Sequence, residues 1–290
     1  MFIYLNGSIV DQKDAAISPF DHGFMYGMGV FETFRTYEGH PFLFDDHLER
    51  LRDGLQEMGI EWRKTRQSLL EALADILAKN GLRDASIRFN VSAGTAADIP
   101  QAEVYRNPMT ILYVRQLPAN PPKSKAVKIL NTRRNTPEGE FRLKSHHFFN
   151  NILGKREAGS DSGLEGVFLT EKGHLAEGVT SNIFWVKNEV VYTPSIDTGI
   201  LNGITRQFVL ALCRENNVSI ETGKFKLDEL YNCDEAFITN SGQEIVPLYR
   251  VNHEYLPSQE GKVTQQLKQW YHTYRNHLWS RREIGRKGAR

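Results

Sequence analysis

The feature that most limits how this chain can fold is a proline-rich segment at residues 116–125, with the sequence QLPANPPKSK. It holds three of the eleven prolines, and the adjacent Pro121 and Pro122 each lack a backbone N–H donor. Neither a helix nor a central strand can pass through such a pair. The segment therefore predicts a linker over 116–125 between a first unit at 1–115 and a second unit at 126–290.

Hydrophobic spacing on the N-terminal side of the linker alternates between the period of strands and the period of helices. We expect one helix to begin at Asp45 or Asp46, which are good N-cap residues, and to end at Gly59. A second helix should run from about Gln67 to Asn80. Strands are predicted at 2–5, 87–91 and 110–114.

The part of the chain after the linker shows the same alternation over a greater length. Its strands are predicted at 127–130, 166–169, 182–186, 190–192 and 235–238, and its helices at 145–158, 204–216 and 262–278. Helices interleaved with strands on both sides of the linker indicate an α/β or α+β fold in two units.

Composition excludes several classes of protein. Lys and Arg number 36 against 35 Asp and Glu, which gives a formal net charge of +1 and no overall field to favour nucleic acid or an anionic membrane. A hydrophobic content of 40% is enough for a core. The longest apolar run, at 208–213, is too short to span a membrane, and the N-terminus lacks the features of a secretory signal. We expect a globular protein of the cytoplasm.

Two short motifs suggest a ligand and then fail. Gly27 and Gly29 resemble the start of a dinucleotide-binding fingerprint, but Glu32 stands where the third glycine belongs. His146 and His147 are adjacent, so on a helix their side chains point about 100° apart, and no further metal-binding motif accompanies them. The sequence predicts neither a Rossmann site nor a metal site.

Six other segments make sense together. They are GVFETFR at 29–35, DDHLERL at 45–51, FRLKSHHFFNNIL at 141–153, LAEGVTSNIF at 175–184, TGILNGITR at 198–206 and ITNSGQEIVP at 238–247. In this order and spacing they resemble the fold-type IV pyridoxal-phosphate enzymes, which include branched-chain aminotransferases, D-amino acid aminotransferases and 4-amino-4-deoxychorismate lyases. The resemblance covers nearly the whole chain. It implies a small N-terminal α+β domain, a larger C-terminal domain, an active site in the cleft between them, and a homodimer.

The resemblance also implies roles for single residues. Lys144 matches the lysine that holds the aldehyde of pyridoxal 5'-phosphate as a Schiff base and later moves a proton. Glu177 matches the carboxylate that keeps the pyridine nitrogen protonated. Taken alone, Lys144 would be read as a solvated surface lysine and Glu177 as a loop acid, and only the surrounding segments favour the catalytic interpretation.

The phosphate of this cofactor needs charge-assisted and backbone donors. Arg50 matches the phosphate arginine of the family, although by itself it could be a helix-surface partner of an acid. Ile204 and Thr205 open a predicted helix, where free N–H groups suit a dianion. Ser241 matches a further phosphate contact, and Asn182 completes the cofactor-binding set.

The same resemblance bears on the reaction. Branched-chain aminotransferases carry a tyrosine five residues after the lysine, where this chain has Phe149. D-amino acid aminotransferases use Arg and His in a loop that corresponds to 90–98, which holds neither. Residues 18–27 and 133–147 are similar to aminodeoxychorismate lyases of Bacillus-like bacteria. We therefore expect a lyase that makes p-aminobenzoate and pyruvate, in folate biosynthesis. A branched-chain-type aminotransferase is the alternative, and a D-amino acid aminotransferase or a non-enzymatic binding protein is less favoured.

A substrate with two carboxylates favours a basic pocket, so the expected partner is a small anionic molecule. Clustered arginines are more often solvated surface groups, and both interpretations stay open. The residues that we expect to line the pocket are Tyr26, Thr33, Arg35, Arg133, Arg142 and His146, with Arg134 and His147 as further candidates.

Overall fold

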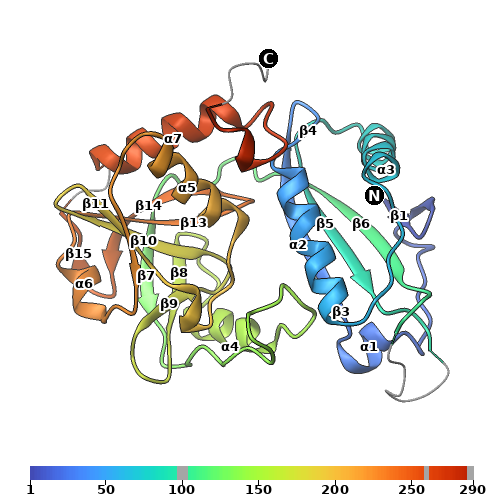
Figure 1. Ribbon diagram of the computed structural model, residues 1–290, viewed down its shortest axis with the longest axis horizontal. Coiled ribbons are helices and arrows are strands. Elements are labelled where there is room, and N and C mark those ends of the chain that lie inside the picture. Colours follow the sequence, from blue (N-terminus) through green and yellow to red (C-terminus); the bar gives the residue numbers. More distant parts are fainter. Residues whose placement is uncertain (97–103, 258–260, 286–290) are drawn as a thin grey trace. The chain divides into compact units, whose positions relative to one another are not determined.

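The computed structural model describes residues 1–96, 104–257 and 261–285 (Figure 1). The chain forms two compact units. Unit 1 comprises 1–118, 143–147 and 276–280, and unit 2 comprises 119–142, 148–275 and 281–290. The first boundary, at 118/119, lies inside the proline-rich segment, but the short segments 143–147 and 276–280 pack with unit 1 although the sequence placed them in the second unit. Within the described part of the chain, no helix is both long and apolar enough to cross a membrane.

Unit 1 is built on one antiparallel sheet with the strand order β2-β1-β6-β5-β3-β4. The strands are β1 (Phe2–Leu5), β2 (Ser8–Asp11), β3 (Gly29–Tyr37), β4 (His40–Pro41), β5 (Ala85–Ser92) and β6 (Met109–Gln116). The helices are α1 (His22–Tyr26), α2 (Phe44–Glu57) and α3 (Arg66–Lys79). Figure 1 shows α2 lying along the sheet over β3, and α3 lies against β1 and β6.

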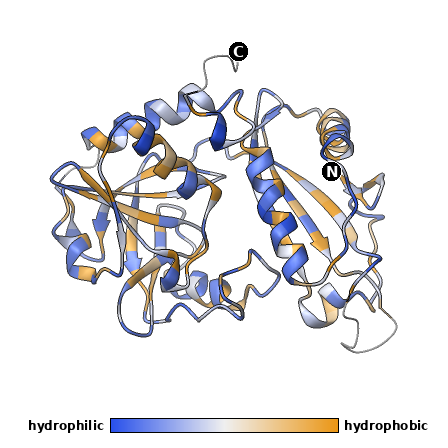
Figure 2. Ribbon diagram, viewed as in Figure 1, coloured by the Kyte–Doolittle hydropathy of each residue, from blue (hydrophilic) through white to orange (hydrophobic). Residues whose placement is uncertain are grey.

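The two faces of this sheet differ in chemistry because side chains alternate along each strand. Val30 and Phe34 of β3 point toward α2 and join the core of unit 1. Phe31, Thr33 and Arg35, at the alternate positions, point to the opposite face. Figure 2 shows hydrophobic residues along β5 and β6 and a hydrophilic outer side on α2. The helices therefore bury one face of the sheet, and the other face carries charged side chains such as Arg35 beside aromatic ones such as Phe31.

Two details of unit 1 differ from the expectation. Asp45 and Asp46 lie in the first turn of α2 instead of capping it, and the N-cap is Leu43 with a left-handed φ of 55°. Carboxylates in a first turn still stabilise the helix dipole. The strand β3 was not predicted, because its residues GVFETFRTY do not alternate strictly between apolar and polar. In the stretch compared with D-amino acid enzymes, residues 97 and 98 lie outside the described residues.

Unit 2 contains a nine-stranded sheet with the order β12-β11-β10-β13-β14-β7-β8-β9, and β15 pairs with β14. Its strands are β7 (Lys125–Ile129), β8 (Leu164–Leu169), β9 (Leu175–Gly178), β10 (Asn182–Lys187), β11 (Val190–Pro194), β12 (Ile220–Gly223), β13 (Glu235–Asn240), β14 (Glu244–Val251) and β15 (Glu254–Tyr255). Its helices are α4 (Phe149–Ala158), α5 (Ile204–Glu215), α6 (Leu227–Tyr231) and α7 (Lys262–Tyr274), with 3-10 turns η1 (Ile196–Thr198) and η2 (Arg281–Glu283). The central strands are largely hydrophobic in Figure 2 and bury Trp185 and Phe237.

The predicted helix at 145–158 begins four residues late, at Phe149. The segment before it is extended and pairs with β3 through a bridge between Ser145 and Val30. Because these residues use their backbone groups to bond β3, they cannot also form the first turn of a helix. The helix assignment over 145–148 was therefore wrong.

Candidate active site

Lys144 lies in the extended segment that pairs with the beginning of β3. The backbone N–H of Phe31 donates to the carbonyl of Lys144 at 2.8 Å. Ser145, which faces Val30, is buried, so its two neighbours Lys144 and His146 point to the opposite face of the sheet. There the Lys144 Nζ lies 4.6 Å from the centroid of the Phe31 ring. The structure thus places this lysine on the face of the sheet opposite α2.

Arg88 shares that face and was missed from the sequence. Its guanidinium carbon lies 3.6 Å from the centroid of the same Phe31 ring, so two cations pack against one aromatic side chain. In the register of the sheet, Arg88 on β5 lies directly across from Thr33 on β3. Burial lowers the pKa of the Arg88 guanidinium. A single arginine at an alternate position of a predicted strand was the only signal the sequence offered.

The other pocket candidates of unit 1 lie at different distances from this group. Arg35 is on the same face of β3 and stacks its guanidinium 4.6 Å from the Tyr37 ring centroid. His146 lies with its Nε2 3.0 Å from Asn90 Oδ1. Burial lowers the pKa of His146 to about 4, so the imidazole is neutral near pH 7. Tyr26 is exposed at the end of α1.

Arg50 points from α2 to a carboxylate that the sequence reasoning did not single out. Its Nε and Nη2 donate to the two oxygens of Glu32, each at 2.7 Å. His47 Nδ1 lies 2.6 Å from the same carboxylate, which is buried. Burial would raise the pKa of Glu32, but Arg50 and His47 outweigh it and lower the pKa to about 2. Burial lowers the pKa of His47 itself. A bidentate pair therefore fixes the plane of the Arg50 guanidinium.

Glu177 is the centre of a buried network in unit 2. Arg134 Nε donates to its Oε1 at 2.8 Å, and the backbone N–H of Leu201 donates to its Oε2 at 3.0 Å. Asn182 Nδ2 lies 3.4 Å from the same Oε2. The carboxylate is 4% exposed. These donors hold Glu177 in one orientation.

The three candidate arginines at 133–142 separate into different environments. Arg134 is buried, and its Nη1 donates to Asn150 Oδ1 at 2.7 Å, so it connects Glu177 to the first turn of α4. Arg142 donates from Nε to the carbonyl of Gly199 at 2.5 Å. Burial, with Arg134 nearby, lowers the pKa of Arg142 to about 10. Arg133 is exposed. Arg134 therefore holds Glu177 in place, and the hydrogen bonds of its guanidinium go to residues of unit 2.

The beginning of α5 forms a cradle of small and polar groups. Gly203 is the N-cap, and a Cβ placed there would lie 2.2 Å from Asn182 Oδ1. Ile204 and Thr205 form the first turn, whose N–H groups have no carbonyl partner inside the helix. Thr205 Oγ1 lies 3.2 Å from Ser241 Oγ. The helix terminus and the two hydroxyls suit an anion such as phosphate.

A family model described as amino-transferase class IV matches residues 29–251. The chain belongs to the class IV aminotransferase family. This confirms the resemblance inferred from the six segments, and the two-sheet α+β fold agrees with it.

Similar proteins include enzymes of both reaction types. The chain is 47% identical over 272 residues to the aminodeoxychorismate lyase of Bacillus subtilis, covering 93% of both chains. It is 30% identical to the D-alanine aminotransferase of Bacillus licheniformis, covering 89% of this chain and 91% of that one. The solved branched-chain amino acid aminotransferase of Escherichia coli superposes with a TM-score of 0.85 at 25% identity, covering 99% of this chain and 97% of the other.

Class IV aminotransferases and aminodeoxychorismate lyases depend on pyridoxal phosphate, which confirms the predicted cofactor. The residues of this class IV chain fit that group. Unit 2 holds a carboxylate, Glu177, and an anion cradle at α5, and the amide of Asn182 contacts Glu177 and abuts the Gly203 turn. A Cβ at Gly203 would overlap the amide oxygen of Asn182, which stands beside this cradle. Unit 1 holds the lysine and the arginine that the family resemblance assigns to the same cofactor.

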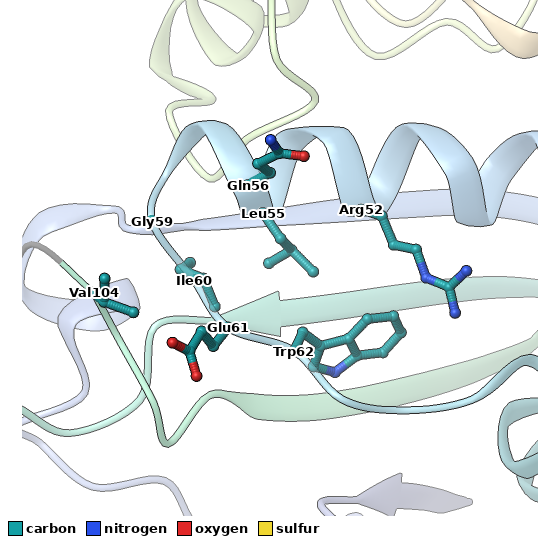
Figure 3. Close-up of a pocket in the computed structure, with 8 residues that line it drawn as sticks. All are labelled: Arg52, Leu55, Gln56, Gly59, Ile60, Glu61, Trp62 and Val104. Carbon is teal, nitrogen blue, oxygen red and sulfur yellow. The ribbon is translucent and has the colours of Figure 1, made fainter.

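A separate surface pocket of about 390 Å³ lies in unit 1 of this class IV enzyme, at the end of α2 (Figure 3). Its lining is mixed, with Trp62, Leu55 and Ile60 beside Arg52 and Glu61. None of the sequence-predicted site residues lines it. In the described ranges, no three His, Cys, Asp or Glu side chains are arranged to hold a metal ion.

Proposed function

We propose that this protein is an aminodeoxychorismate lyase, which converts 4-amino-4-deoxychorismate to p-aminobenzoate and pyruvate and thereby serves folate biosynthesis. The observation that carries the proposal is the 47% identity to the B. subtilis lyase over 93% of both chains. The identity to the D-alanine aminotransferase is lower, at 30% over 89% of this chain. A branched-chain-type aminotransferase is the second candidate, favoured by the superposition on the E. coli enzyme at a TM-score of 0.85.

In this proposal Lys144 attaches the cofactor and moves the proton. When bound, pyridoxal phosphate supplies an electron sink for the pair left on the substrate carbon that bears nitrogen. The amine of Lys144, released when the substrate amine takes its place, would remove the proton from C4 of the substrate. The C3–O bond then breaks, and its electron pair leaves with enolpyruvate, which takes up a proton and becomes pyruvate. The ring gains its third double bond and becomes aromatic, so atoms and electrons balance.

Unit 2 supplies the groups that would hold the ring and the phosphate. Glu177, kept in place by Arg134, would accept from the protonated pyridine nitrogen and so favour its charged form. The N–H groups of Ile204 and Thr205 and the hydroxyl of Ser241 would donate to phosphate oxygens. Arg50 of unit 1, which the family resemblance assigns to the phosphate, would add a charge-assisted contact, and its bidentate pairing with Glu32 fixes the plane of the guanidinium.

We propose that Arg88 binds a carboxylate of the substrate. It packs against the same Phe31 ring as Lys144, and a partly buried guanidinium without a full shell of water favours a carboxylate partner. Replacing Arg88 with Met should raise KM for aminodeoxychorismate by about ten- to a hundredfold, because a hydrogen bond to a charged group contributes roughly 1.5–3 kcal/mol. Arg115→Met removes an exposed arginine from the neighbouring strand β6 and is the matched control. Equal KM values for the two variants would refute this role.

We also propose that the enzyme is a homodimer of the cytoplasm, which subcellular fractionation can test. Exposed apolar side chains between Ile17 and Tyr26 support an interface there, with Phe20 at 66% and Phe24 at 71% exposure. Replacing Phe24 with Glu should shift the sedimentation coefficient to that of a monomer. The control is Tyr255→Glu, at a similarly exposed aromatic of unit 2. A monomeric wild type would contradict the proposal.

The reaction itself is tested by two incubations of the purified protein with pyridoxal phosphate. With aminodeoxychorismate, we expect pyruvate and p-aminobenzoate in equal amounts, and neither with Lys144→Ala. With leucine and 2-oxoglutarate, we expect little or no glutamate. Glutamate formation without pyruvate would replace the lyase with the aminotransferase.

A further inference from the structure

The two short motifs to which the sequence assigned no function, Gly27–Gly29 and His146–His147, lie against each other in unit 1. A Cβ at Gly29 would lie 2.3 Å from His146 Cε1, and a Cβ at Gly27 would lie 2.6 Å from His147 Cδ2. Both imidazole rings therefore occupy space that any other residue at these two positions would need. The pairs Gly27–His147 and Gly29–His146 are here called the glycine–histidine contacts.

Backbone bonds join the same two segments between these contacts. The N–H of His146 donates to the carbonyl of Gly29 at 2.9 Å, and the N–H of Phe31 donates to the carbonyl of Lys144 at 2.8 Å. His146 is held on its other side by Asn90, whose Oδ1 lies 3.0 Å from Nε2. The segment that carries Lys144 is thus fixed by its backbone and by the imidazole two residues later.

Gly29 is the more informative of the two glycines. Gly27 ends α1 with a φ of 73°, a conformation that favours glycine whatever surrounds it. Gly29 does not have a left-handed φ, so backbone freedom does not explain a glycine there. The close approach of His146, together with the carbonyl of Val91 at 2.8 Å from a Cβ, does explain it.

We propose that Gly27 and Gly29 are positioning residues for Lys144, acting through His147 and His146. The inference rests on the proposed function, in which Lys144 attaches the cofactor and moves a proton. A long lysine side chain reaches its target only if its backbone is fixed, and a displacement of about 1 Å in a catalytic group can lower the rate about a hundredfold. Without the glycines, the imidazoles would push the 144–147 segment away from β3.

The decisive experiment is a double-mutant cycle of Gly29→Ala and His146→Ala. We expect Gly29→Ala to lower kcat by about tenfold or more and to shift the pH midpoint of the visible absorbance of the lysine-bound cofactor. In the His146→Ala background the ring is gone, so the same change should cost much less, with a remainder from the Val91 carbonyl. An equal cost in both backgrounds would overturn the inference.

Hydrogen exchange of the cofactor-free protein gives an independent readout. Gly29→Ala should speed exchange of the amides of Phe31 and His146, which bond across the two segments, and His146→Ala should remove most of that effect. Unchanged exchange at both amides would contradict the inference.

The Gly27 contact has its own control at Gly39. Both glycines are left-handed, with φ of 73° and 90°, but a Cβ at Gly39 would meet nothing within 4 Å. Gly27→Ala should therefore shift the absorbance midpoint, and Gly39→Ala should not. Equal midpoints would overturn the role of Gly27. Failure of the Lys144 role on which the inference rests is distinguishable, because borohydride reduction of the wild type would then leave Lys144 unmodified.

Discussion

Replacing Glu32 with Gln tests the buried carboxylate that holds Arg50. The change keeps the shape of the side chain but removes the charge that pairs with Arg50 and His47. Folding lowers the pKa of Glu32 from 4.5 to about 2. Such a difference contributes roughly 3 kcal/mol to the free energy of unfolding near neutral pH.

The sign of the pH dependence follows from the lowered pKa. A carboxylate that is more acidic in the folded state stabilises it fully above the unfolded pKa, and this contribution disappears as the pH falls through the folded value. The difference between wild type and Glu32→Gln should therefore be about 3 kcal/mol at pH 7 and about half of that at pH 3. The variant should also bind pyridoxal phosphate more weakly, because Arg50 loses the partner that fixes its plane.

Urea titrations read by hydrogen exchange of peptides from α2 and β3 measure this difference within unit 1. Glu61→Gln is the matched control, since Glu61 pairs with the exposed Arg63 at 3.0 Å and should change stability by less than about 0.5 kcal/mol. A Glu32→Gln difference that is the same at pH 7 and pH 3 would refute the electrostatic reasoning.

Three further outcomes are expected. Gly203→Ala should weaken binding of pyridoxal phosphate about ten- to a hundredfold in an equilibrium titration, because the new Cβ overlaps Asn182 Oδ1, and unchanged affinity would contradict the cradle. Arg134→Met should lower kcat more than it raises KM, since Arg134 supports Glu177, and a change in KM alone would instead indicate a substrate contact. The two buried cysteines, whose pKa burial raises to about 12, should react with a thiol reagent only after urea is added, as an absorbance assay would show.

Local patterns in the sequence were sufficient for many elements of the fold. Helix spacing located α2, α3, α5 and α7 to within a few residues. The helix prediction for 145–148 was wrong because the backbone of this segment bonds to β3, which lies more than a hundred residues earlier in the chain. Spacing along a chain carries no information about such a partner.

The residues of the candidate site also fall into two groups, those that local sequence patterns predict and those that depend on distant partners. Lys144 and Glu177 were predicted because they stand in segments that resemble the family, and their roles stay predictions. Glu32 and Arg88 were missed because their importance depends on what lies beside them, a guanidinium in one case and a shared aromatic ring in the other. The role of Gly29 likewise appears only when His146 is placed against it.

The most direct test of the lyase reaction is the ratio of pyruvate to p-aminobenzoate formed from 4-amino-4-deoxychorismate by the purified enzyme. We expect a ratio of one to one for the wild type and neither product for Lys144→Ala, with no requirement for a keto acid. Product formation that persists in Lys144→Ala, or glutamate from leucine and 2-oxoglutarate in place of pyruvate, would contradict it.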